Sequence, residues 1–147
     1  RIVGKCIPEM KDELLSLAKR KVDDISWLKF VDEVTHEEVI REFNQADLFV
    51  FPSYSEGFPN VILEAMACGC PIVSSDVGAI PEMLDISGDA CGICFKSRSA
   101  TEVKAAIESL LFDESLKNSF AQKAKSRVYE MYSIPKVWQQ LVDIWKG

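Results

Sequence analysis

Two glutamates eight residues apart, Glu56 and Glu64, are the side chains of this sequence best placed to do chemistry. The segment Gly57-Phe58-Pro59 between them predicts a turn, and the apolar run that follows predicts a helix. Pro59 suits the first helical position, where its missing N–H costs nothing. Gly69 suits the far end, where a left-handed residue closes a helix.

The start of this helix is suited to bind an anion. The N–H groups of Asn60, Val61 and Ile62 have no partner one turn earlier, and the helix dipole adds positive potential, so the site favours phosphate. Glu64 lies inside the apolar run, where an ionised carboxylate needs a hydrogen-bonding partner such as a ligand hydroxyl. On spacing alone a purely structural role is equally open. Glu56 would then compensate the dipole, and Glu64 would be the one polar edge of a buried helix.

Strands flank this segment on both sides. Residues 48–51 are apolar and end at Pro52, which predicts a fully buried parallel strand, and residues 71–75 predict a second strand. The loop with Glu56 therefore lies at the carboxyl end of a strand. Open α/β sheets bind their ligands at such ends.

The run 46–82, with Glu56 and Glu64 separated by seven residues and followed by Ala65-Met-Ala-Cys-Gly69, resembles the signature of the retaining family 4 glycosyltransferases. The resemblance extends along almost the whole chain. It implies the GT-B architecture, in which two Rossmann-like domains face each other across a cleft. We therefore expect residues 1–147 to form one α/β donor-binding domain, the carboxy-terminal one, with a Rossmann-like parallel sheet and helices on both faces.

The resemblance also implies roles for single residues. Glu56 is expected to be the catalytic residue, contacting hydroxyl groups of the donor sugar and acting electrostatically, with a role as nucleophile as the less favoured alternative. Glu64 is expected to bond the ribose. The other positions implied to bind the nucleotide-diphosphate sugar are Gly57, Phe58, Pro59, Asn60, Val61, Ile62 and Gly4. For Gly4 a simple strand-to-helix turn is an equally good interpretation. No metal and no other cofactor is expected, because the helix dipole and cations take over that role.

The chain begins inside a strand, at Ile2-Val-Gly4, which leads us to expect a piece of a longer protein. In the family the domain starts one strand and one helix earlier, with a glycine-rich segment whose Arg and Lys clamp the diphosphate. An amino-terminal acceptor domain also belongs to the enzyme. Neither part matches this sequence, so the chain alone is expected not to turn over.

The composition of the chain argues against a nucleic-acid partner and against a membrane-spanning segment. The chain has 147 residues, is 48% apolar, which is enough for one core, and carries a net charge of −6, whereas nucleic acid requires a basic face. No apolar run approaches the ~20 residues of a membrane span, and no signal peptide is visible. We expect a cytoplasmic protein, with peripheral association of the full enzyme with the membrane left open. Lys123, Lys125 and Arg127 predict a solvated helix face.

Two other functions compete with this interpretation. A non-catalytic nucleotide-sugar-binding or regulatory domain would share the same motif. A flavodoxin-like thiol-redox or interaction module would use Cys91 and Cys94, which have the C-x-x-C spacing, with Cys68 and Cys70 as a second near pair. Ordinary buried thiols are the favoured interpretation of these cysteines.

Alternating patterns along the chain predict right-handed βαβ units and a parallel sheet. A capping box at Thr35–Glu38 opens one of the helices. Further strands are expected at residues 2–3, 25–31 and 90–95, and further helices at 9–21, 37–45, 99–112, 114–131 and 134–146.

Overall fold

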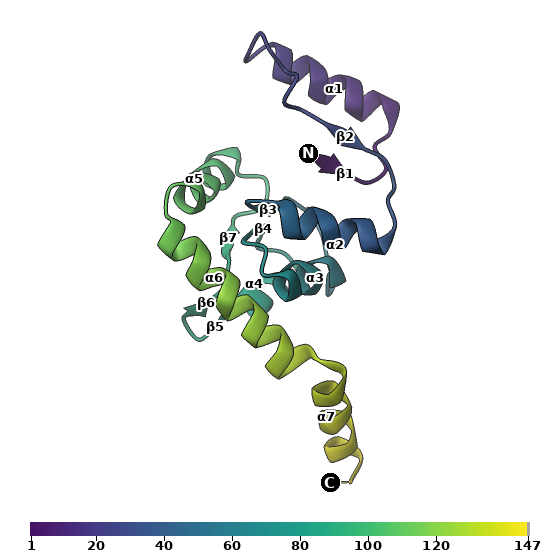
Figure 1. Ribbon diagram of the computed structural model, residues 1–147, viewed down its shortest axis with the longest axis vertical. Helices are drawn as coiled ribbons and strands as arrows, with labels where there is room; N and C mark the ends of the chain where they lie inside the picture. The colour runs from purple at the N-terminus through teal and green to yellow at the C-terminus, as the bar shows by residue number, and fades with distance from the viewer. Residues whose placement is uncertain (147) are drawn as a thin grey trace. The chain divides into compact units, whose positions relative to one another are not determined.

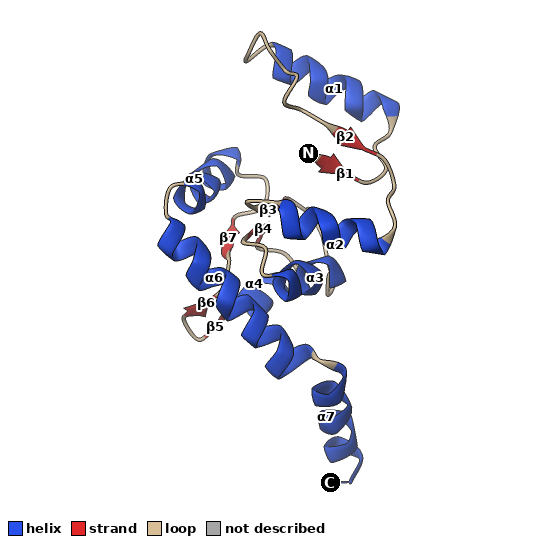
Figure 2. Cartoon of the chain, viewed as in Figure 1, coloured by secondary structure: helices blue, strands red, loops and turns tan. Residues whose placement is uncertain are grey.

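The computed structural model describes residues 1–146, in which helices alternate with short strands (Figure 2). The chain divides into two compact units, the first comprising Arg1–Val39 and the second beginning at Ile40. The prediction of one domain over residues 1–147 stays a prediction.

The first unit is a strand–helix–strand segment. Strands β1 (Ile2–Val3) and β2 (Phe30–Val31) pair in parallel, and helix α1 (Pro8–Lys19) connects them. The ammonium group of Lys11 lies over the Phe30 ring, 5.2 Å from its centroid, which ties the helix to β2. Strand β2 is much shorter than the predicted strand at 25–31.

Asp24 explains that shortening. Its carboxylate accepts hydrogen bonds from the Ser26 amide at 2.8 Å and the Ser26 hydroxyl at 3.1 Å, and its carbonyl accepts one from Trp27 Nε1 at 3.0 Å. These local bonds hold the backbone in a turn, in competition with a strand ladder. The bonds from Ser26 also lower the pKa of Asp24.

Helix α2 (His36–Gln45) begins as predicted. The Thr35 amide and hydroxyl donate to Glu38 Oε2 at 2.8 and 2.9 Å, and the Glu38 amide donates to Thr35 Oγ1 at 3.3 Å. This reciprocal pair is a capping box, so that prediction is confirmed.

The second unit is built on a three-stranded parallel sheet in the order β3 (Phe49–Phe51), β4 (Ile72–Ser75), β7 (Ile93–Phe95). Strand β4 is buried along its whole length, as expected for the middle strand. Strand β3 is only partly buried, so the prediction of a fully buried strand at 48–51 is wrong for this unit. The reason is position, because β3 lies at one side of this sheet.

Helices cover the sheet. Figure 1 shows α3 (Asn60–Cys68) and α5 (Ala100–Leu111) on different sides of the three strands, and both pack on β4. The core on the α5 side also includes α6 (Glu114–Arg127) and consists of Val73, Phe95, Ala106, Leu110 and Phe120. The predicted α/β fold, with a parallel sheet and helices, is confirmed.

The predicted strand at 90–95 is divided in the structure. Strands β5 (Asp85–Ile86) and β6 (Asp89–Ala90) form an antiparallel hairpin, preceded by the short helix α4 (Ile80–Leu84), and β7 starts only at Ile93. Between them a Cβ atom on Gly92 would lie 3.1 Å from the Ile72 carbonyl oxygen. The residues around Gly92 therefore pass close to β4, and pairing with β4 begins after it, at Ile93.

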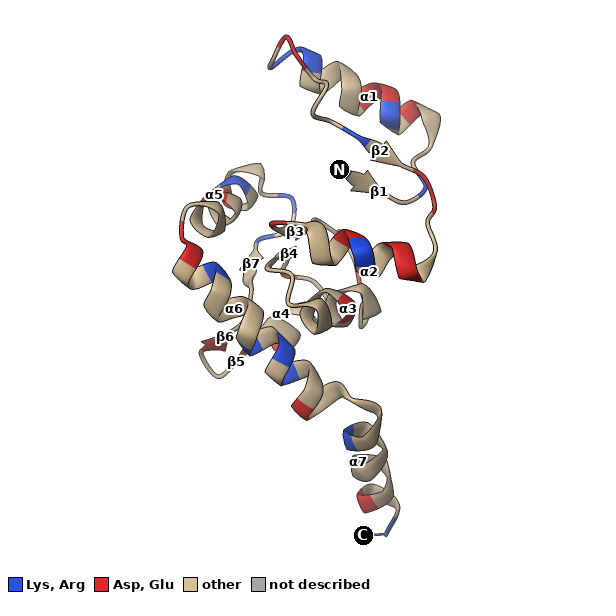
Figure 3. Cartoon of the chain, in the orientation of Figure 1, with Lys and Arg blue, Asp and Glu red and all other residues tan. Residues whose placement is uncertain are grey.

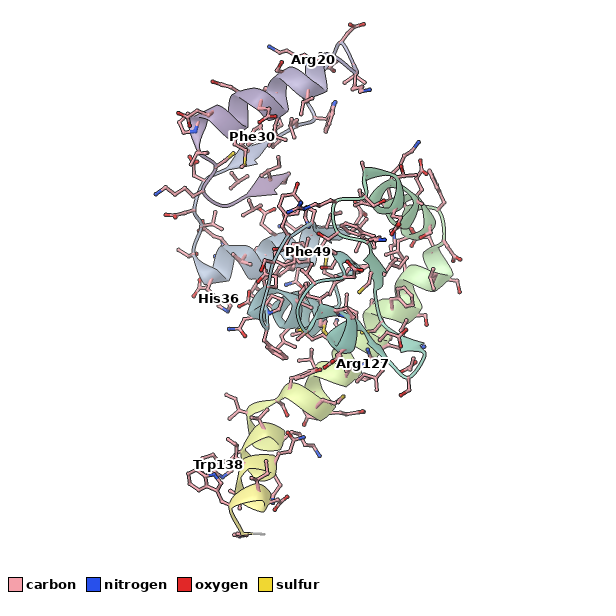
Figure 4. All side chains as sticks on the ribbon, turned by 180° about the vertical axis from the view of Figure 1, so that it is seen from behind. Arg20, Phe30, His36, Phe49, Arg127 and Trp138 are labelled. Atoms are coloured by element: carbon pink, nitrogen blue, oxygen red, sulfur yellow. The ribbon has the colours of Figure 1, made fainter. Side chains whose placement is uncertain are left out.

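The predicted helix at 114–131 continues beyond α6 as one turn of π-helix, η1 (Val128–Tyr132). The last helix, α7 (Ile134–Lys146), agrees with the prediction at 134–146. Its apolar side chains lie in solvent within the described part of the chain. Trp138, which projects from α7 in Figure 4, is 67% exposed and Trp145 is 87% exposed.

Candidate functional site

The carboxyl ends of the three parallel strands meet at one edge of the sheet in the second unit. Phe51 is in register with Ser74, and Ser75 with Phe95. Three loops leave from this edge: residues 52–59, which we call the acid loop, residues 76–79 and residues 96–99. Ligands of open α/β sheets bind at such an edge.

Glu56 is oriented by two serines. The Ser53 hydroxyl donates to Glu56 Oε1 at 2.7 Å, and the Ser75 hydroxyl at the end of β4 donates to the Ser53 carbonyl at 2.6 Å. The chain of bonds from β4 through Ser53 therefore fixes where the Glu56 carboxylate lies. A carboxylate has lone pairs for about four hydrogen bonds, so Glu56 keeps the capacity to accept ligand hydroxyl groups.

The loop after β4, residues 76–79, contacts the backbone of the acid loop. The Ala79 amide donates to the Gly57 carbonyl at 2.9 Å. Gly78 has a left-handed φ of +57°, and a Cβ atom there would lie 2.4 Å from the Glu56 carbonyl oxygen. Only glycine fits this position without displacing the backbone of the acid loop.

Helix α3 begins one residue later than predicted. Pro59 is the N-cap, with φ −76° and ψ 110°, and no side chain caps the helix. The Ile62 amide donates to the Pro59 carbonyl at 3.1 Å, so this amide is already paired and cannot serve an anion as predicted. Asn60 and Val61 remain as the first amides of the helix, where no turn precedes them. Gly69 closes α3 with φ 69°, as predicted.

The remaining predicted positions lie in both units, with Phe58 and Glu64 in the second unit and Gly4 in the first. Phe58 is 51% exposed, and its ring lies 5.9 Å from that of Tyr132 in η1. Glu64 is partly exposed on α3, one turn before Cys68. Gly4 belongs to the first unit, where it ends β1 with φ +117° and its amide donates to the Val31 carbonyl at 2.9 Å.

The apolar run does not make α3 buried on all sides. Ile62, Ala65 and Met66 are fully buried, whereas Ala67 is exposed and Glu64 partly so. The helix therefore has one solvent side, and Glu64 lies near it.

Two surface hollows are lined by residues outside the acid loop. One is on α1, beside Asp12 and Arg20, and the other is between the β5–β6 hairpin and α6, beside Asp89 and Ser126. Within residues 1–146 no three His, Cys, Asp or Glu side chains are grouped so as to hold a metal ion. None of the described helices is long and apolar enough to span a membrane.

Burial, and no disulfide, characterises the C-x-x-C pair Cys91 and Cys94 in the structure. All five are free thiols. Burial raises the pKa of Cys94 to about 11 and also raises that of Cys91, in spite of the neighbouring Arg127 guanidinium. Because the thiolate is the reactive form, these two cysteines are poor nucleophiles at neutral pH. Burial likewise raises the pKa of Cys70 to about 11.

The predicted solvated face on α6 is wrong for Arg127, whereas Lys123 and Lys125 are exposed as predicted. Arg127 is only 6% exposed, and its guanidinium donates to the carbonyls of Met83 and Asp89, to Cys91 Sγ and to the Asp89 carboxylate. Lys123 also pairs with Asp89, at 2.6 Å. Figure 3 shows these basic positions on α6 beside the acidic hairpin.

Sequence reasoning missed the residues that hold the site together. Ser53, Ser75 and Gly78 were seen only as strand ends and loop residues. A signal was present, because a serine three residues before an acid can hydrogen-bond to it, and a glycine in the loop that follows a strand can mark a close backbone approach.

The family described as "Glycosyl transferases group 1" matches residues 1–127. The chain belongs to this family. The match covers both units and includes the acid loop, α3 and the loop after β4. The resemblance inferred from the acidic motif is thereby confirmed, as is the relation to GT-B glycosyltransferases.

Relatives of this group 1 chain are longer proteins. N-acetyl-alpha-D-glucosaminyl L-malate synthase of Bacillus anthracis is 36% identical over 100 residues, which are 68% of this chain and 26% of that protein. O-antigen chain mannosyltransferase B of Escherichia coli is 36% identical over 104 residues, 71% of this chain and 26% of that protein. The chain thus spans about a quarter of the length of these relatives.

Solved structures agree with this assignment. The C-terminal domain of the group 1 glycosyl transferase LpcC from Francisella tularensis superposes with a TM-score of 0.72 at 26% identity, over 86% of this chain and 64% of that one. Anabaena Alr3699/HepE, solved with UDP-glucose, gives a TM-score of 0.79 at 20% identity, over 98% of this chain and 39% of that one. The second likeness shows the fold alone.

Proposed function

We propose that this chain is the donor-binding part of a retaining glycosyltransferase that transfers a hexosyl unit from a nucleoside-diphosphate sugar to a glycan or lipid-linked acceptor. The observation that carries the proposal is the placement of Glu56. Its carboxylate is held by Ser53 at the carboxyl edge of a parallel sheet, directly before the uncapped start of α3. Membership of the group 1 family supports the reaction class.

The chemistry follows from this placement. Sugar transfer leaves negative charge on the departing diphosphate while positive charge develops on the sugar. The first amides of α3, at Asn60 and Val61, with the positive end of the helix dipole, would stabilise the diphosphate. Glu56 would bind sugar hydroxyl groups with the capacity that Ser53 leaves unused, and so position the donor. Glu64 would bond the ribose.

The acceptor is proposed from the name of a relative. One relative, from Campylobacter jejuni, is named N,N'-diacetylbacillosaminyl-diphospho-undecaprenol alpha-1,3-N-acetylgalactosaminyltransferase and is 38% identical over 87 residues, 59% of this chain and 23% of that protein. Its name describes a lipid-linked acceptor. This favours a lipid-linked or glycan acceptor here, an amino-terminal acceptor domain as partner, and a place of action at the cytoplasmic face of the membrane.

Titration with a panel of UDP-glucose, GDP-mannose and ADP-glucose tests the function. We expect one of them to shift the backbone amide resonances of Glu56, Gly57, Asn60 and Val61. In an enzyme that carries this domain, Glu56→Gln should slow transfer by about two to three orders of magnitude, the usual loss for one preorganised transition-state hydrogen bond. A slowing of less than about threefold would reject the role of Glu56.

A matched control separates the site from general loss of charge. Glu108 on α5 is an exposed acid that pairs with Lys104 at 3.7 Å, so Glu108→Gln should leave binding and transfer unchanged. We further propose that donor binding needs no divalent metal, since the helix start supplies the positive potential. Equal affinity in EDTA and in Mg²⁺ is expected, and a strict need for Mg²⁺ would overturn this part.

A further inference from the structure

Arg98 has a backbone conformation that its side chain does not favour. It follows β7 with φ 69°, and together with Ser87 at φ 55° it is one of two non-glycine residues in the described chain with a left-handed φ. The two residues before Arg98 are held by acidic side chains. The Ser97 amide donates to Asp76 Oδ1 at 2.8 Å and the Lys96 amide to Glu102 Oε2 at 2.7 Å.

The side chain of Arg98 reaches across the edge of the sheet to the acid loop. Its guanidinium carbon lies 5.0 Å from the centroid of the Tyr54 ring. Tyr54 is 68% exposed, so little buried apolar surface supports the contact. An exposed cation–π contact stabilises less than a left-handed non-glycine residue costs. The contact with Tyr54 therefore does not offset the cost of the left-handed conformation of Arg98. A residue that is retained at a cost in stability points to a role in the site.

Tyr54 lies in the part of the acid loop that sets the position of Glu56. Ser53, directly before it, bonds to Glu56 through its hydroxyl and to Ser75 through its carbonyl. Gly57 is held by Ala79. The backbone between these two anchors has no further backbone hydrogen bond to another strand or loop among residues 1–146. A side chain from another loop can therefore restrain residues 54–56 by contacting the Tyr54 ring.

We propose that Arg98 is a positioning residue, which holds Tyr54 and thereby keeps Glu56 in place for the donor. The inference rests on the proposed function, because it assumes that the acid loop binds the nucleotide sugar. Arg98 itself touches no substrate in this proposal. It acts through the aromatic ring.

Replacement of Arg98 by glycine separates this role from a structural one. Arg98→Gly removes the guanidinium but suits the left-handed backbone, so the melting temperature should stay or rise. The affinity for the nucleotide sugar that binds in the panel above should fall by about two- to fivefold, which is what an exposed cation–π contact is worth. Ser87→Gly is the matched control, because it relieves the same backbone conformation in the β5–β6 turn, and its affinity should not change.

A double-mutant cycle decides whether Arg98 acts through Tyr54. If it does, Arg98→Gly combined with Tyr54→Ala binds no more weakly than Tyr54→Ala alone. Additive losses would mean that Arg98 contacts the donor directly, and would overturn the proposal. Unchanged affinity in Arg98→Gly would do so as well.

A measurement without ligand keeps the two proposals apart. Amide ¹⁵N relaxation of residues 54–58 should show greater mobility in Arg98→Gly than in the wild type, and no change in Ser87→Gly. If the wild-type chain bound none of the nucleotide sugars, the proposed function would fail, and the relaxation data would still decide whether Arg98 orders the loop. Equal mobility in the wild type and in Arg98→Gly would refute that ordering.

Discussion

A Cβ atom on Gly78 would lie 2.4 Å from the carbonyl oxygen of Glu56 and 2.6 Å from that of Gly57. The backbone after β4 therefore runs directly against the backbone that carries the candidate catalytic acid. Both neighbours are backbone atoms, which cannot rotate away as a side chain would. The position of Glu56 thus depends on a glycine that is distant in sequence.

Gly78→Ala should destabilise the protein by about 2 to 4 kcal/mol, since it combines a left-handed alanine with overpacking against the backbone. Chemical denaturation measures this loss, and the amide resonances of Glu56 and Gly57 should move. Gly88→Ala is the control, because Gly88 is also left-handed, at φ +88°, but has open space around it. It should cost only about 1 to 2 kcal/mol. Equal losses in both variants would show that the approach at Gly78 is not tight.

Gly57→Ala should leave the stability nearly unchanged but weaken the binding of the nucleotide sugar. A Cβ atom on Gly57 meets no atom within 4 Å, and its φ lies outside the left-handed region. Stability should therefore change by less than about 0.5 kcal/mol. If the backbone here must approach the donor closely, affinity should fall by about tenfold, which corresponds to about 1.4 kcal/mol. Calorimetric titration with the bound nucleotide sugar measures this, and unaltered affinity would exclude Gly57 from the pocket.

Arg127→Met should be among the most destabilising substitutions in the second unit. The buried guanidinium bonds to the carbonyls of Met83 and Asp89 and to the Asp89 carboxylate, and it joins α6 to the β5–β6 hairpin. Removing one partner of such a network costs about 3 to 5 kcal/mol. Lys123→Met removes the exposed partner of the same acid and should cost at most about 1 kcal/mol. Urea unfolding of both variants compares the two losses, and similar values would contradict the role of Arg127.

The ion pairs of Asp89 should make the stability of the second unit depend on pH in the acidic range. The hydrogen bond from Lys123, with the charges of Lys123 and Arg127, lowers the pKa of Asp89 below its ordinary value of 3.8. Its contribution to stability is therefore complete above pH 3.8 and is lost as the pH falls through the lower, folded-state pKa. Asp89→Asn should melt below the wild type at pH 7, and the difference should shrink between about pH 4 and pH 2. A difference that stays constant over that range would contradict the pairing.

Local sequence patterns were sufficient for much of the fold. The capping box at Thr35–Glu38, the helix end at Gly69, the buried strand β4 and the last helix depend on residues close in the chain. Errors arose where tertiary contacts prevail. Arg127 looks like a solvated charge in sequence, yet it is buried because the carbonyl groups it bonds to come from α4 and the β5–β6 hairpin.

The identity of the acidic motif and its place after a strand were determined by the sequence alone, because strand, turn and helix signals are local and Glu56 and Glu64 lie within one such unit. Only the tertiary structure decided what holds Glu56. Ser75, Gly78 and Arg98 come from the ends of β4 and β7, and parallel pairing brings those ends to the same edge as the acid loop. Residues separated by 22 to 44 positions meet there through pairing of strands, which no local pattern encodes.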